Sequence, residues 1–93
     1  MKMTAVSKEK MNEAIQEIKT CYQNNKILSK CIEDLDFNDY IAHITLKLKV
    51  IHPIEFKEML NLNSQLKLSE LFCIGPNDYT SLVIDYKVKE VTP

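Results

Sequence analysis

The string Asp34-x-Asp36-x-Asn38 opens like a calcium-binding loop, in which oxygen ligands alternate along the chain. The rest of such a loop does not follow. Its sixth position, which needs glycine for a sharp turn, is Asp39, and its twelfth, which needs a bidentate glutamate, is Thr45. We therefore predict no metal site here and expect these acids to solvate a loop between a helix and a strand, with Asx turns.

The histidines and cysteines give no further metal or redox signature. His43 and His52 are an odd number of residues apart, so on one strand they would point to opposite faces. Cys21, Cys31 and Cys73 contain no C-x-x-C pair. We predict three reduced thiols, with Cys21 and Cys73 buried, in a cytoplasmic protein, with no metal and no cofactor.

The composition argues against the common catalytic devices. The chain has 1 glycine, and all 12 of its basic residues are lysine, so it holds no glycine-rich phosphate loop and no arginine finger. It also lacks a G-x-S-x-G motif, and no cysteine stands at an evident helix N-terminus, where a thiolate would be stabilised. We predict that the protein is not an enzyme; a small hydrolase is the alternative with the weakest support.

Length and charge point to one ordinary globular domain over residues 1–93. The chain is 45% apolar and 27% charged, with a net charge of −1, so no overall field attracts nucleic acid or membrane. Met1 to Lys10 has no apolar signal-peptide region, and the longest apolar run, Leu71–Ile74, is far too short to span a membrane. No membrane association is expected.

Residues 7–35 lack proline and glycine and show a heptad pattern, which predicts one long amphipathic helix capped by Ser7. Such a stripe is typical of a coiled-coil seam, and a polar side chain within it would fix the register of a homodimer. Packing of the same helix on its own domain's sheet is the alternative, and parallel and antiparallel pairing both stay open. The predicted dimer seam is Met11, Ala14, Ile15, Ile18, Cys21, Tyr22, Asn25, Leu28 and Ile32.

Residues 36–93 are predicted to form a small head. Apolar and polar residues alternate over 40–51, with Tyr40 on the buried side, and again over 82–88, which is typical of half-buried strands. Pro53 is expected to begin a short helix with Phe56, Met59 and Leu60 on one face. Residues 65–74 fit a strand or a helix, and a turn at 75–78 favours a hairpin. The predicted class is α+β: a long helix, a three-stranded antiparallel sheet and one short helix.

The exposed face of these strands is the candidate binding surface. Its lysines are expected to gather into one patch, flanked by apolar side chains that suit a protein interface. We predict a homodimeric binding protein, an adaptor, regulator or inhibitor of another macromolecule; a nucleic-acid-binding dimer that uses the lysines is the alternative and is not favoured, because no aromatic platform accompanies them. The predicted partner face is Ile41, His43, Thr45, Lys47, Lys49, Ile51, Val83, Asp85, Lys87 and Lys89.

Overall fold

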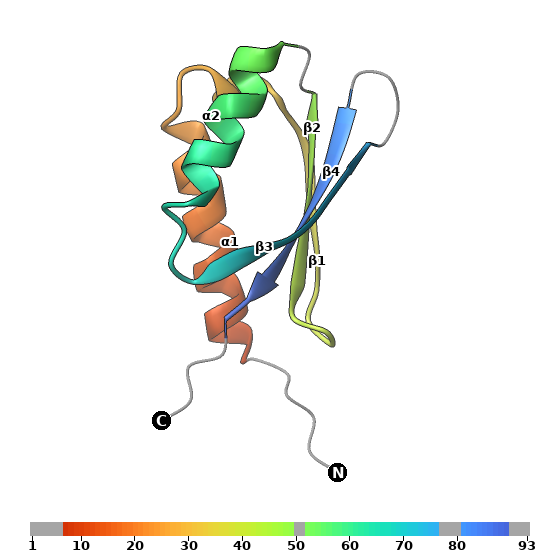
Figure 1. The fold of residues 1–93 in the computed structure, drawn as a ribbon. Coiled ribbons are helices and arrows are strands. Elements are labelled where there is room, and N and C mark those ends of the chain that lie inside the picture. Colours follow the sequence, from red (N-terminus) through yellow and green to blue (C-terminus); the bar gives the residue numbers. More distant parts are fainter. Residues whose placement is uncertain (1–6, 50–51, 77–80, 90–93) are drawn as a thin grey trace.

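The computed structural model describes residues 7–49, 52–76 and 81–89. Over these residues the elements are α1 (Lys8–Gln23), the 3-10 turn η1 (Leu28–Lys30), β1 (Ile32–Asn38), β2 (His43–Lys49), α2 (Pro53–Asn63), β3 (Ser69–Pro76) and β4 (Ser81–Val88). The strands pair antiparallel in the order β1-β2-β4-β3. Both helices lie on one face of this sheet, and no helix among the described residues covers the other face (Figure 1). The α+β class is confirmed, but the sheet has four strands within the described residues where three were predicted.

Helix α1 packs its apolar stripe on its own sheet. The Ser7 side chain accepts a hydrogen bond from the backbone N–H of Lys10 at 3.2 Å, as expected of the N-cap. The stripe contributes to one core with the inner side chains of β2 and β4. The structure thus corrects the predicted seam, because these side chains are already covered within one chain. The buried members on α1 are Met11, Ala14, Ile15, Ile18 and Tyr22.

The helix also ends earlier than predicted, at Gln23 instead of near residue 35. Asn25 gives the physical reason: its Oδ1 accepts the backbone N–H groups of Ile27 and Leu28, both at 2.9 Å, which replaces helical bonding by a new turn. Two other predicted seam residues therefore leave the helix. Leu28 is buried in η1, and Ile32 is half-buried in β1.

Strand β1 replaces the loop predicted for the acidic string. It pairs with β2 so that Asp34 lies opposite Lys47 and Asp36 opposite Thr45. The prediction that β2 begins at Tyr40 is wrong, because Tyr40 lies in the turn with 71% of its surface exposed. Ala42 closes this turn with a φ of 57°, and β2 begins at the next residue.

The alternation in the two central strands is confirmed. Ile44, Leu46 and Leu48 of β2 are buried, as are Ile84 and Tyr86 of β4. The ambiguous segment 65–74 contributes strand β3, which pairs with β4 as the favoured hairpin required. Gly75 and Pro76 belong to β3, and the rest of the predicted turn lies outside the described residues.

Helix α2 begins at Pro53 as predicted. The Glu55 side chain turns back and accepts the backbone N–H of His52 at 3.0 Å, which satisfies a donor at the helix start. The buried face differs from the prediction, since Met59 is buried with Leu62, whereas Phe56 and Leu60 are exposed.

Candidate functional site

The uncovered face of the sheet, called the outer face below, displays side chains in ranks across the strands. In an antiparallel sheet, residues paired directly across strands point to the same side. The pairing produces three ranks from β1 to β3: Asn38, His43, Lys87 and Glu70; Asp36, Thr45, Asp85 and Cys73; Asp34, Lys47, Val83 and Gly75.

Positive and negative side chains alternate across these ranks. Lys47 lies opposite Asp34, and Lys87 lies opposite Glu70. In the central rank the hydroxyl of Thr45 donates a hydrogen bond of 2.6 Å to the Asp85 carboxylate. The outer face therefore offers separate positive and negative points instead of a field of one sign.

The lysines do not form the single patch expected from the sequence. Lys87 pairs with His43 and Lys47 pairs with Val83, so the two are four residues apart along the strands. At about 3.3 Å per residue this is a separation of about 13 Å. The hydrogen-bonded pair of Thr45 and Asp85 lies between them. The alternation of side chains predicted the correct face of the sheet for each lysine, but only the pairing register shows that Lys47 and Lys87 are separated.

Phe72 is a member of this face that sequence reasoning missed. Its ring lies against the imidazole of His43, with centroids 5.1 Å apart and the planes inclined at 57°, and 63% of its surface is exposed. Phe72 lies two residues after Glu70 and therefore follows the alternation onto the outer face. The register irregularity between Leu71 and Cys73 then places Cys73, opposite Asp85, on the same face. The prediction that Cys73 is buried is wrong, since it is exposed.

The other predicted partner-face residues are spread more widely. Ile41 is exposed in the turn between β1 and β2, and Val83 is half-buried at the centre of β4. Lys49 and Lys89 are exposed near the ends of β2 and β4. Ile51 lies outside the described residues.

Behind the sheet, two tyrosines meet in the core. The hydroxyls of Tyr22 on α1 and Tyr86 on β4 are 2.7 Å apart, and that of Tyr86 also donates to Oδ1 of Asn63 at 2.6 Å. Burial raises the pKa of Tyr22 to about 12 and raises that of Tyr86 well above its usual range. Both phenols are therefore protonated near neutral pH and unsuited to act as bases, so this cluster serves to join α1, α2 and β4.

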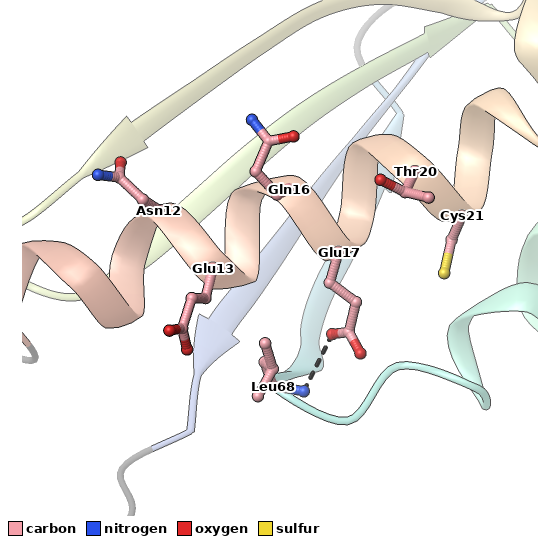
Figure 2. A pocket seen from close by; sticks show the side chains of 7 residues that line it. All are labelled: Asn12, Glu13, Gln16, Glu17, Thr20, Cys21 and Leu68. Carbon is pink, nitrogen blue, oxygen red and sulfur yellow. Dashed lines mark hydrogen bonds between the residues drawn. The ribbon is translucent and has the colours of Figure 1, made fainter.

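A shallow groove of about 570 Å³ runs along α1 beside the start of β3 (Figure 2). Burial, together with the neighbouring Glu17, raises the pKa of the Cys21 thiol, which keeps it in the poorly nucleophilic protonated form. Cys21 was predicted to be a buried member of the seam; it is half-buried and lines this groove. The lining is Asn12, Glu13, Gln16, Glu17, Thr20, Cys21 and Leu68.

The groove owes part of its shape to Glu17. Its carboxylate accepts the backbone N–H groups of Lys67 at 2.9 Å and Leu68 at 3.0 Å, and Figure 2 shows the second bond. We expect Glu17→Ala to lower the free energy of unfolding by roughly 1–2 kcal/mol, because two charge-assisted bonds to a partly exposed carboxylate are lost. Urea unfolding followed by circular dichroism measures this. Glu13→Ala, an exposed change on the same helix, is the control and should cost under about 0.5 kcal/mol.

In the described part of the chain, no group of three or more His, Cys, Asp or Glu side chains is arranged to hold a metal ion. No helix there is long and apolar enough to cross a membrane. Comparisons with protein families, curated proteins and solved structures gave no match to the chain.

Proposed function

We propose that the chain is a small, non-enzymatic, cytoplasmic homodimer that binds another protein through its outer face, as an adaptor, regulator or inhibitor. The observation that carries the proposal is the uncovered sheet face, with charges of both signs in register and an exposed aromatic ring, Phe72, resting on His43. Protein interfaces combine aromatic anchors with complementary charges at fixed positions. A second protein is the class of partner that such a pattern suits.

The charge arrangement supports a protein over a nucleic acid. A phosphate backbone requires cations that follow one another along its path. On the outer face, Asp34 lies opposite Lys47 and Glu70 opposite Lys87, and either carboxylate would repel phosphate. The net charge of −1 adds no long-range attraction.

Charge reversal on the outer face tests the proposal. The biotinylated protein is used to capture partners from a lysate of its own cells, and the captured proteins are quantified by mass spectrometry. We expect Lys47→Glu with Lys87→Glu to reduce the capture of specific partners at least tenfold. Each change places a negative charge where the partner surface is complementary to a positive one, so like charges would meet. Lys57→Glu, an exposed change on α2, is the matched control. Partners lost with Lys57→Glu and kept by the double variant would place the binding surface on the helices instead.

The nucleic-acid alternative has its own measurement. Fluorescence anisotropy with labelled single- and double-stranded DNA and RNA at low salt is expected to show no binding. If all four predicted lysines contacted phosphates, binding would appear, and log K would fall against log salt with a slope of about −3 to −4.

A further inference from the structure

A polar pocket of about 300 Å³ lies between the C-terminal ends of α1 and α2, on the helix side of the sheet and away from the outer face (Figure 1). Its volume is at the lower end of the range for small-ligand pockets, about 300–1,000 Å³. Amide and carboxylate oxygens in its lining can accept hydrogen bonds from a ligand. These polar lining residues are Asn24, Asn25, Asn61, Gln65 and Glu58.

The two helix ends make this pocket electronegative. Carbonyl groups at a helix C-terminus carry a partial negative charge, which a basic side chain in the last turn commonly offsets. Neither α1 nor α2 has a basic residue in its last turn. The carboxylate of Glu58 adds a full negative charge, and none of the described residues that line the pocket is a lysine. The pocket therefore favours a cation.

Glu58 is held in position and keeps the capacity to accept further hydrogen bonds. Its Oε1 accepts a bond of 3.1 Å from Nδ2 of Asn25, and a carboxylate has room for several donors. Within the part of the chain that the structure describes, Glu58 forms no ion pair. The lysines adjacent in sequence, Lys26 beside Asn25 and Lys57 beside Glu58, are exposed and do not line the pocket.

We propose that this pocket binds a primary ammonium group at the end of an aliphatic chain. An ammonium group has three N–H donors and no acceptor, which matches a carboxylate surrounded by amide oxygens. Leu62 and Cys21, the apolar part of the lining, contact the methylene groups of the chain. A divalent metal ion fits less well, because the described residues contain no group of three or more His, Cys, Asp or Glu side chains arranged to hold one.

Titration of the full chain with butylammonium chloride, followed by heteronuclear NMR, tests the proposal. The side-chain amide signals of the pocket report directly on its occupation. We expect saturable shifts of the signals of Asn24, Asn25, Asn61 and Gln65. Sodium chloride at the same ionic strength and butanol, which has the same chain without the charge, should not produce them. Equal shifts with either control would overturn the ammonium site.

Removal of the carboxylate charge identifies the group that holds the cation. Glu58→Gln keeps an oxygen for Asn25 and should lower the affinity for butylammonium at least tenfold, because a charge-assisted hydrogen bond becomes a neutral one. Glu70→Gln, which removes the same charge from the outer face, is the matched control and should leave the affinity unchanged. An unchanged affinity in Glu58→Gln would contradict the proposal.

Asn61→Lys supplies the pocket with a cation of its own, so the test does not depend on a destabilised variant. The new side chain lies three residues after Glu58 and in the last turn of α2, where a cation is favourable. We expect a higher midpoint of thermal unfolding than in Asn61→Gln, which has a comparable helix propensity and no charge, and loss of the shifts caused by butylammonium. Undiminished binding of butylammonium to Asn61→Lys would overturn the site.

A small amine and a lysine side chain of another protein carry the same ammonium group, and a lysine blocked at both ends separates these two sources. Tighter binding of the blocked lysine than of butylammonium would assign the pocket to a lysine of a partner protein. Tighter binding of butylammonium would assign it to a small amine, because the pocket then excludes the peptide backbone. Either order supports the ammonium site, and the absence of saturable shifts with both probes would overturn it.

Discussion

Above pH 10 the free energy of unfolding is expected to fall by about 1.4 kcal/mol per pH unit for each of Tyr22 and Tyr86. In the unfolded chain both phenols titrate near their ordinary value of 10.0, whereas burial raises the pKa of Tyr22 to about 12 and that of Tyr86 further. The unfolded state therefore loses protons that the folded state keeps. The stabilisation is complete below pH 10 and is lost as the pH rises toward and beyond the folded-state values.

Urea unfolding measured between pH 9 and pH 12 gives this slope, and ultraviolet absorbance at the phenolate band follows the titration itself. Tyr22→Phe with Tyr86→Phe is the control, because it keeps both rings and removes both protons. We expect the double variant to show a flatter dependence than the unaltered protein, whatever its stability at neutral pH. An equally steep decline in the double variant would assign the alkaline sensitivity to other groups and contradict the buried pair.

Shortening a side chain at the centre of the α1 stripe is expected to remove a large part of the free energy of unfolding of the domain. Ile18 has 0% of its surface exposed, and replacement of a buried isoleucine by alanine typically costs about 2–5 kcal/mol. Small domains are stable by only about 5–15 kcal/mol. Ile18→Ala should therefore shift the urea midpoint strongly, whereas Lys19→Ala, on the exposed side, should stay within about 0.5 kcal/mol.

This change also separates the two interpretations of the stripe. If α1 lies on its own sheet, Ile18→Ala lowers the stability of each copy and leaves the association constant of folded protein unchanged. Sedimentation under native conditions provides that comparison. Loss of dimer with an unchanged monomer stability would restore the coiled-coil seam and contradict the packing described here.

The sequence-based predictions were most accurate for elements with one face exposed to solvent and the other buried. The alternation in β2 and β4 assigned Ile44, Leu46, Ile84 and Tyr86 to the core, because a period of two has no other explanation. The start of α2 was equally clear from Pro53. The stripe of α1 was found as well, but a heptad repeat and the 3.6-residue period of a surface helix differ little over the 16 residues of this helix, so the pattern alone did not identify what covers it.

The failures have local causes that composition does not reveal. Asn25 ends the helix by accepting two backbone N–H groups, which its place in a heptad concealed. The edge strand β1 has the acidic residues of a loop and is held by pairing with β2. Cys73 reaches the outer face because β3 contains one extra residue beside it, and strict alternation cannot reveal such an insertion. For the candidate site, the alternation of side chains therefore predicted which residues of the two inner strands lie on the outer face. Only the pairing register shows how these residues are arranged across the sheet.

The strand order has a consequence for how the chain folds. Strands β1 and β2 follow one another in the sequence, as do β3 and β4, so each pair can form through short loops. The two hairpins join into one sheet only when β2 pairs with β4. This pairing brings His43 opposite Lys87, although a long stretch of sequence that includes α2 separates the two residues. Closing a long loop is entropically costly before its contacts form, and non-local pairing slows folding. The joining of the two hairpins, at the middle of the outer face, is thus the step expected to limit the folding rate.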